Sequence, residues 1–489
     1  MNMKKIFITI VFFISILLFN NSIKAQYSDI TYFMRNTPFS YKMNPAQIPT
    51  SSFYVNFPML SGINLDFKTS GFSYNDLIKR RDDDSLYFDF KGFYNTLSNS
   101  NYIKMNGNFE LFGFGFNAGK KNYISFGIDL NFDARLRFSR DLFGFLSGDK
   151  TFSNEAISIS DNEILSLNSY ISTYLGYTRV VNDKLNVGLR AKFILGLANI
   201  TTEESKLQIS QNDEGITAQS NFLIRSSSMI GSLKLPGLNS SDSIEFNIDS
   251  DSIIANIMRN KGFGIDLGAT YKLNDKMILS FSVQDLGFIK WTANTTDIVS
   301  KNPNGTYTFT GFENISADSS FSQQIEQMAD SITKAFDITT KRGETYTTML
   351  PTKVYVGYDW NFSKKHHLNM LYKASIGSNY FDNYLSVFYA LQLERYLNIS
   401  LGNTFSFENS FNNNKPFNPS IAFNANLLIL NIYFGGSLNS SYNVAKMTGL
   451  NFFFGINSSF GYNNPFKVNK EEPKEENETQ IPEKEIEVE

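Results

Sequence analysis

The chain has 489 residues, a formal net charge of −3 and no cysteine, which excludes disulfides, thiolate metal sites and a lipid-modified N-terminal cysteine. A charge this close to neutral gives no footprint for nucleic-acid binding, so no nucleic acid is expected as a partner. The 47 Phe and 25 Tyr bring the aromatic content to 15%. Such a content is typical of membrane barrels, which place aromatic rings on the lipid-facing surface and at both membrane interfaces.

The N-terminus predicts export. Lys4 and Lys5 precede an apolar stretch at residues 6–19, and residues 23–25 offer a cleavage site, so residues 1–25 are expected to be a signal peptide. The alternative is an uncleaved membrane anchor, which needs about 18 or more apolar residues and therefore a longer run than this one. No later stretch is long and apolar enough for a helical span, so any later membrane residence requires strands.

Residues 26–52 lie between the signal peptide and the first predicted strand. They contain the triplet Asn44, Pro45 and Ala46. The segment is long enough to fold inside a barrel. We therefore expect an N-terminal plug, or hatch, with this triplet as its motif.

Alternation of apolar and polar residues predicts β-strands through most of the chain. In the hairpin at residues 262–288, Phe263, Ile265 and Leu267 alternate with small or polar residues on both sides of a turn at 274–276. Successive strand side chains point to opposite faces, so the hairpin has one apolar and one polar face. The same pattern recurs at residues 53–67, 109–118, 124–132, 171–177, 185–197, 354–360, 368–374, 385–393, 397–401, 421–429, 432–438 and 450–456. These segments predict an all-β protein, an antiparallel transmembrane β-barrel of about 14 strands over residues 53–466.

The predicted connections alternate between short and long. Tight polar turns at 119–122, 182–184, 274–276 and 363–365 separate long segments at about 75–105, 136–168, 201–261 and 291–348. Outer-membrane barrels have short periplasmic turns and longer extracellular loops, which gives the orientation. Within the third long segment, residues 207–210 and 216–224 also look extended. A soluble periplasmic β-sandwich is the alternative, since sandwich strands alternate too.

Short helices are expected in the long loops. Phe321, Ile325, Met328 and Ile332 recur at helical spacing and predict an amphipathic helix. Shorter helical candidates lie at residues 88–97, 141–146 and 253–258. The apolar face of the first helix either packs against other loops as a cap over the barrel mouth or forms an extracellular funnel that collects apolar solutes.

If the apolar face of each strand meets lipid, the polar face lines the lumen. The lumen-facing polar residues are then Asp129, Arg190, Lys192, Asp266, Lys272, Lys353, Asp359, Lys373 and Glu394. Charges of both signs argue against a strongly ion-selective pore. They indicate either an internal network that braces the wall or holds the plug, or a conduction path.

A resemblance accompanies these patterns. The triplet Asn44, Pro45 and Ala46 and the strand text at 262–271 and 283–291 resemble a group of Bacteroidota outer-membrane barrels of unassigned function, distantly similar to FadL-type fatty-acid transporters and to PorV-type barrels of type IX secretion. The resemblance implies a 14-strand barrel with an N-terminal hatch. It carries over no ligand-contacting residue beyond the hatch-like triplet.

The chain gives little support for catalysis. Its only two histidines, His366 and His367, are strand neighbours that point to opposite faces and so do not readily bind one metal. Residues 113–120 resemble a phosphate loop only superficially, because Phe114 occupies a required glycine position and Lys121 replaces Ser or Thr. No enzyme activity, metal or cofactor is expected.

The C-terminal residues 467–489 form a Glu, Lys and Pro tract without apolar periodicity. We expect a disordered acidic periplasmic tail. It serves either as a solvated spacer or as a docking peptide for a periplasmic protein.

The expected function is FadL-like uptake of apolar or amphipathic small molecules through the outer membrane. The alternative is a non-transport accessory barrel, a partner in secretion, assembly or surface attachment. Outer-membrane lipid is an expected partner in both cases, and an apolar small molecule in the first.

Overall fold

The computed structural model describes residues 29–34, 37–140, 157–160, 165–212, 215–231, 250–302, 305, 307–309, 327, 330–378, 380–393, 396–407, 418–438 and 444–462. The predicted signal peptide and acidic tail lie outside these residues. So do Glu394 of the predicted lumen set and Phe321, Ile325 and Met328 of the predicted loop helix.

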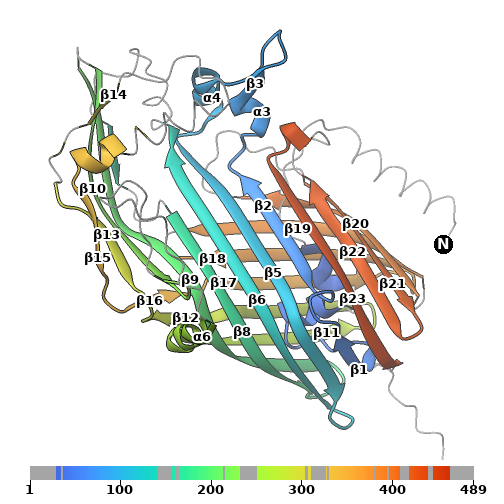
Figure 1. Cartoon of the computed structure of the whole chain (residues 1–489). Helices are drawn as coiled ribbons and strands as arrows, with labels where there is room; N and C mark the ends of the chain where they lie inside the picture. Colours follow the sequence, from blue (N-terminus) through green and yellow to red (C-terminus); the bar gives the residue numbers. More distant parts are fainter. Residues whose placement is uncertain are drawn as a thin grey trace, which may run out of the picture.

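A closed antiparallel barrel of fourteen strand positions forms the body of the molecule (Figure 1). In chain order the positions are occupied by β1 (Ser51–Asn56) together with β2 (Ile63–Thr69), β5 (Ser100–Asn117), β6 (Asn122–Ser139), β8 (Leu165–Val180), β9 (Leu185–Asn212), β11 (Lys261–Asn274), β12 (Met277–Trp291), β16 (Tyr346–Met349) together with β17 (Thr352–Asn361), β18 (His366–Ile376), β19 (Phe381–Leu393), β20 (Leu397–Ser406), β21 (Pro419–Leu427), β22 (Leu430–Leu438) and β23 (Gly449–Tyr462). The ring closes because β1 and β2 each pair with β23 on one side and β5 on the other. Each predicted strand segment corresponds to one of these positions, so the predicted fold class is confirmed.

The two faces of the wall have the chemistry that the alternation predicts. On β11, Phe263 and Leu267 are 57% and 45% exposed on the outer face, whereas Asp266 between them is fully buried inside. Large apolar side chains are exposed in the same way on β12, β18, β21 and β23. An apolar outer band with polar alternation inward is the arrangement that a bilayer requires of a barrel.

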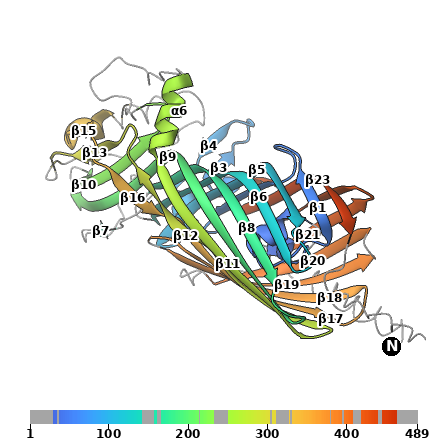
Figure 2. The same ribbon diagram turned by 90° about the horizontal axis from the view of Figure 1, so that it is seen from below.

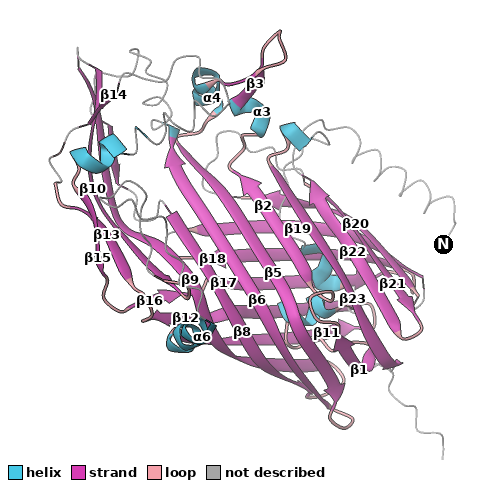
Figure 3. Cartoon of the chain, viewed as in Figure 1, coloured by secondary structure: helices cyan, strands magenta, loops and turns pink. Residues whose placement is uncertain are grey.

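The helices in the described part of the chain are short (Figure 3). They include η1 (Asp29–Phe33), α2 (Pro38–Met43), α3 (Tyr74–Leu77), α4 (Phe90–Thr96), α6 (Ser250–Arg259) and η2 (Val444–Lys446), and a small hairpin of β3 (Ile78–Arg80) and β4 (Leu86–Phe88) lies beside α3. Among the described residues, no helix is long and apolar enough to cross a bilayer. Of the expected loop helices, 88–97 and 253–258 correspond to α4 and α6, 141–146 lies outside the described residues, and Ile332 lies half-buried in a helical stretch at 330–335.

One predicted strand is wrong in detail. The structure divides residues 53–67 into β1 and β2, separated by a loop at 57–62. Pro58 has no amide hydrogen for the strand ladder, and Met59 adopts a left-handed backbone with φ of 58°. These two residues interrupt the strand although the apolar alternation around them continues.

A second sheet region extends beyond the barrel at the end with the long connections. Strand β9 has 28 residues, far more than the 9 to 11 or so that cross a bilayer. Its outer part pairs with β7 (Ile157–Ser160) and β10 (Gly215–Ser228), and β10 pairs in turn with β13 (Thr296–Ser300) and β14 (Tyr307–Phe309), while β15 (Ile338–Arg342) pairs with β13. Figure 2 shows this arm leaning away from the barrel. The expected extension at 207–210 and 216–224 is confirmed, whereas the strands within 291–348 were not predicted because three to five residues are too few to show alternation.

The lipid-facing assignment predicts a position-dependent cost of charge. Leu267 lies near the middle of the apolar face of β11, and Leu428 lies at the β21–β22 turn, where it is 77% exposed. We expect Leu267→Arg to lower the free energy of unfolding by about 2 to 4 kcal/mol and Leu428→Arg by about 1 kcal/mol or less, because the bilayer midplane disfavours charge most. Urea unfolding from phospholipid vesicles measures both. Equal losses would contradict the assignment of the outer face.

Candidate functional site

The described part of residues 29–50 fills the barrel interior near the short-turn end (Figure 1). We call this segment the plug. Its apolar side chains pack against aromatic and aliphatic groups on the inner face of the wall. The cluster comprises Ile30, Tyr32, Met34 and Phe39 of the plug and Tyr355, Leu371, Phe388, Ala422, Tyr433 and Phe453 of the wall. The plug therefore has its hydrophobic core in common with the barrel.

The wall also completes the hydrogen bonding of helix α2. The last carbonyls of a helix have no partner within the helix. Here Arg190 on β9 donates to the carbonyls of Tyr41, at 2.6 Å, and Lys42, at 2.8 Å, and Ser282 on β12 donates to the carbonyl of Met43 at 2.7 Å. A cation at this end also interacts favourably with the helix dipole. The C-terminus of α2 is thus attached to two wall strands.

Asn44, the first residue of the predicted plug motif, is fully buried. Its side-chain amide donates to the hydroxyl of Tyr32 at 3.0 Å and to the carbonyl of Phe281 at 3.3 Å, and its oxygen accepts from the amide of Ala46 at 2.9 Å. The Tyr32 hydroxyl donates in turn to Ser280 at 3.0 Å. One asparagine therefore ties the turn after α2 to helix η1 and to β12.

Two wall glycines make room for this turn. A Cβ at Gly188 would overlap the carbonyl of Pro45, and a Cβ at Gly268 would overlap Oδ1 of Asn44. Thr178 donates to the same Pro45 carbonyl at 2.5 Å. The backbone of the triplet therefore lies directly against the backbone of β9 and β11, an approach that only glycine permits.

Ion pairs connect the plug to the wall and the wall strands to one another. Lys42 Nζ lies 2.6 Å from Asp129 Oδ1 and 3.2 Å from Glu110 Oε2. On the opposite side, Lys373 Nζ lies 3.1 Å from Asp29 Oδ1. Removing one member of a buried ion pair leaves the other charge uncompensated, which is strongly destabilising. These ion pairs therefore favour a single position of the plug inside the barrel.

A second set of ion pairs crosses β9, β11, β12 and β17. Asp266 lies 3.0 Å from Arg190 and 2.8 Å from Lys192, and Asp285 lies 2.6 Å from Lys192 and 3.1 Å from Lys353. A third set, on other strands, joins Asp382 to Lys104 at 2.9 Å and to Arg135 at 2.8 Å. Carboxylates and cations thus compensate one another around much of the lumen.

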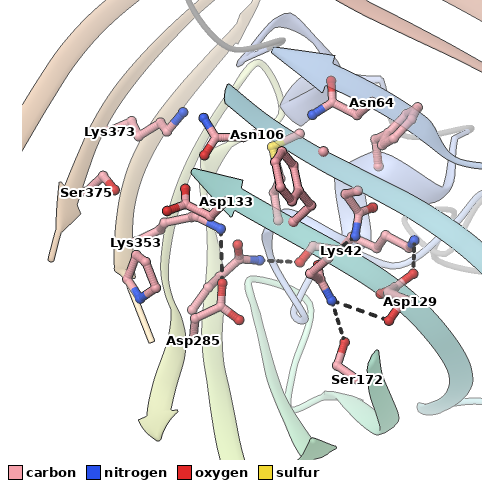
Figure 4. A pocket seen from close by; sticks show the side chains of 18 of the residues that line it. Lys42, Asn64, Asn106, Asp129, Asp133, Ser172, Asp285, Lys353, Lys373 and Ser375 are labelled. Atoms are coloured by element: carbon pink, nitrogen blue, oxygen red, sulfur yellow. Dashed lines mark hydrogen bonds and ion pairs between the residues drawn. The ribbon is translucent and has the colours of Figure 1, made fainter. Parts of the chain in front are cut away.

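Above the plug these groups surround a cavity of about 140 Å³ (Figure 4). Figure 4 shows Lys42 reaching Asp129 and Lys353 reaching Asp285 at its edge. Its charged lining consists of Lys42, Lys104, Arg190, Lys192, Lys353, Lys373, Asp129, Asp133 and Asp285. Several aromatic rings also line it, among them Phe39, Tyr355 and Tyr384. The floor is formed by the plug itself.

A smaller cavity of about 30 Å³ lies on the other side of the plug. It is lined by Phe33, Ala46 and Gln47 of the plug and by Asp359 and other residues of the wall. No described residue lines both cavities. The plug therefore separates two compartments of the lumen.

The structure places the predicted lumen residues in three groups. Asp129, Arg190, Lys192, Lys353 and Lys373 line the upper cavity, and Asp266 lies directly behind its wall. Asp359 faces the lower cavity and accepts a hydrogen bond from Asn369 at 2.9 Å. Lys272 lies at the short-turn rim, where its ammonium is 2.9 Å from Asp275 and its hydrogen bond lowers the pKa of that exposed carboxyl.

Sequence reasoning missed Asp285, which holds two lysines together. Asp285 is a bulge residue with φ of 59°, and the β11–β12 register shifts beside it. The bulge lets Gln284 and Asp285 both lie buried on the inner side. Two consecutive polar residues in an otherwise alternating strand could have indicated this bulge.

The loop at 57–62 interrupts the wall beside the plug. Its amides and carbonyls bond to both neighbouring strands, with Met59 N–H donating to the Glu110 carbonyl at 3.1 Å and Ile456 N–H donating to the Leu60 carbonyl at 2.9 Å. Met59 and Leu60 are exposed on the outer surface. On the inner side, a Cβ at Gly62 would lie 3.5 Å from Lys42 Nζ. The loop thus has lipid-compatible side chains outside and the plug immediately inside.

The two histidines contact different residues. His366 Nδ1 lies 2.6 Å from the hydroxyl of Tyr389, whereas His367 Nδ1 lies 3.8 Å from Asp359. Within the described residues, no group of three or more potential ligands is arranged to hold a metal ion.

A closed antiparallel barrel with an apolar outer band and a polar interior defines a transmembrane β-barrel protein. The chain belongs to a family of unknown function, DUF5723, whose model matches residues 45–436. No curated protein sequence matches the chain.

Several solved structures are similar to it. A deltaS2S3 mutant of the TodX monoaromatic hydrocarbon channel has 10% sequence identity and a TM-score of 0.43, covering 91% of this chain and 96% of that chain. The Ralstonia pickettii toluene transporter TbuX has 10% identity and a TM-score of 0.41, covering 86% and 94%. A Pseudomonas aeruginosa FadL homologue has 11% identity and a TM-score of 0.39, covering 87% and 94%.

The glycine contacts predict that adding one methyl group to the wall at Gly268 weakens the packing of the plug. A Cβ at Gly268 would meet Asn44, whereas a Cβ at Gly264, on the same face of β11, would meet nothing closer than 3.5 Å. Because the chain has no cysteine, Ala46→Cys provides a single buried thiol. We expect Gly268→Ala to raise its labelling by a membrane-impermeant maleimide about tenfold, which corresponds to about 1.4 kcal/mol of easier opening. Gly264→Ala is the matched control and should leave labelling unchanged; equal labelling in both would contradict the glycine cradle.

Proposed function

We propose that the protein is an outer-membrane channel that takes up small amphipathic or apolar molecules and releases them sideways through the wall at residues 57–62. The long connections and the β-sheet arm then face the cell exterior, and the short turns face the periplasm, as is usual for such barrels. The apolar outer band supports residence in the membrane.

The interrupted first strand carries the proposal. At residues 57–62 the wall has no regular β-ladder. The plug lies on the inner side of this loop, and Met59 is 62% exposed on the outer side. Lys42 of the plug pairs with Glu110, whose backbone bonds to this loop on both sides. A movement of the plug would therefore alter the Lys42–Glu110 ion pair and, through Glu110, the hydrogen bonds that hold the loop. This coupling supports a lateral route between the lumen and the membrane.

The lining of the upper cavity favours amphipathic molecules within this class. Its charged side chains suit a polar or charged head group. One lining residue, Tyr170, also belongs to an apolar cluster with Ile194, Ile289 and Trp291. A molecule with one polar and one apolar end can contact both surfaces, whereas a pure hydrocarbon would displace water from the charged groups without offering them a hydrogen bond.

Closing the strand tests the route. Replacing residues 57–62 by Val-Ser would join β1 to β2 with two residues, the number that separates Asn457 from Phe454 in the paired strand β23. We expect uptake of a fluorescent alkyl carboxylate or alkyl amine into proteoliposomes to fall about tenfold or more, equivalent to about 1.4 kcal/mol or more of additional barrier.

Met59→Ser, which keeps the loop, is the matched control and should retain uptake. Heat-modifiable migration on gels verifies that both variants form barrels. Undiminished uptake in the closed-strand variant would overturn the lateral route, and absence of uptake in every form, including Gly268→Ala, would overturn transport itself.

A second candidate function is that of an accessory barrel that engages another protein. The observation in its favour is the arm, which carries a polar groove of about 350 Å³ between β10, β13 and β15. Arg225 lines this groove, and its guanidinium lies 2.9 Å from Glu203 and 3.7 Å from Asp297.

Shortening the arm discriminates between the two functions. Replacing residues 206–221 by an Asn-Gly turn removes paired residues of one hairpin, since Lys206 pairs with Asn221. If the protein is a channel, we expect solute uptake to persist at more than about half the original rate. Loss of a specific co-purified protein from native membranes, with uptake absent throughout, would favour the accessory function.

A further inference from the structure

We infer that the outer wall carries a binding site for a phosphate-bearing membrane lipid, formed by Arg259, Lys261 and Lys290. The inference rests on the proposed outer-membrane location. It concerns the lipid-facing surface and is independent of what passes through the lumen.

The two lysines are direct neighbours on the outer face. Lys261 pairs with Lys290 across β11 and β12, and the next outward pair toward the short-turn end is Phe263 with Phe288. Both lysines are exposed, as are both phenylalanines. The cations therefore stand immediately beyond the end of the apolar band.

The height of the band places them at the level of lipid head groups. Exposed apolar side chains on β11 run from Phe263 to Leu273, a span of ten residues or about 34 Å along the strand. With the usual strand tilt of about 45°, this span corresponds to about 25 Å across the membrane, the height of the hydrocarbon band of a barrel. Lys261 lies two residues further, beyond the hydrocarbon and on the long-loop side.

The third cation comes from the end of helix α6. The guanidinium of Arg259 donates to the carbonyl of Thr292 at 3.0 Å, which holds it above the strand that carries Lys290. Within the described residues, none of the three cations forms an ion pair with a carboxylate. Like charges directly opposite on neighbouring strands repel each other. An external anion would remove this repulsion.

Helix α6 indicates that the anion belongs to a lipid. Ile254 and Met258, one turn apart, are 61% and 47% exposed, while Asn256 on another side of the helix donates to the carbonyl of Met229 at 3.0 Å and attaches the helix to the protein. Exposed apolar side chains next to basic ones are the pattern of a helix that lies in the membrane interface. Acyl chains would contact the apolar residues while the phosphate meets the cations. Soluble anions offer no partner for Ile254 and Met258.

Native mass spectrometry of the delipidated full chain in detergent, titrated with lipid A, tests the site. We expect the triple variant Arg259→Gln, Lys261→Gln, Lys290→Gln to bind about a hundredfold more weakly, because each basic residue near an anionic lipid surface contributes to binding. The matched control, Lys276→Gln, Lys364→Gln, Lys365→Gln, removes three exposed cations at the short-turn end and should bind lipid A as the original chain does.

Three comparisons decide the outcome. Equal binding by the triple variant and the original chain overturns the site. Competition by inorganic phosphate at the same concentration as lipid A overturns the lipid assignment in favour of a free anion, and equal binding of phosphatidylcholine overturns the role of net charge. Heat-modifiable migration and recovery in the outer-membrane fraction, measured on the same variants, show separately whether the proposed location fails.

Discussion

Pairing of the first strand position with both β5 and β23 is the interaction on which the rest of this structure depends. Inside a bilayer no water is present to satisfy backbone amides and carbonyls, so a barrel is stable only when the ring is complete. Here the strand position that closes the ring is the one divided into β1 and β2. Strands β1 and β2 each bridge the same two neighbours, and the loop between them keeps bonds to both. The chain enters this position directly from the plug, so the plug, the seam of the barrel and the loop are adjacent by connectivity as well as by contact.

Charge compensation is the second constraint. Burying an ion is costly unless partners surround it, and a buried pair that loses one member is worse than no pair at all. The lumen meets this condition with carboxylates that each serve two cations, such as Asp266, Asp285 and Asp382. Lys42 and Asp29 of the plug also form ion pairs with wall residues, so the position of the plug is fixed by charge as well as by apolar contact.

The wall could be predicted from sequence because its signal is local. Alternation with a period of two places Asp129, Arg190 and Asp266 on the inner face without knowledge of any other strand. The ion pairs between inner-face residues could not be predicted. Lys104 and Asp382, for example, are 278 positions apart in the chain, and only strand order, tilt and closure bring them together. The loop at 57–62 was missed because its apolar residues continue the alternation, and Asp285 because a bulge changes phase where a strict period was assumed. The plug motif was located by its place in the chain, but the glycines that receive it, Gly188 and Gly268, belong to strands far away in sequence.

The wall partners of the plug also have a consequence for the order of assembly. The described residues of the plug form their hydrogen bonds, ion pairs and apolar contacts with strands from β5 to β23, so their binding surface does not exist until nearly the whole wall is in place. Chains are made and exported from the N-terminus, and early segments of most proteins begin to fold first. In this barrel the first segment of the described chain must therefore wait longest for its hydrogen-bond, ion-pair and apolar partners. Its insertion would therefore be the last step of maturation, and a barrel arrested just before that step would differ from the finished protein by a vacant lumen rather than by an unfinished wall.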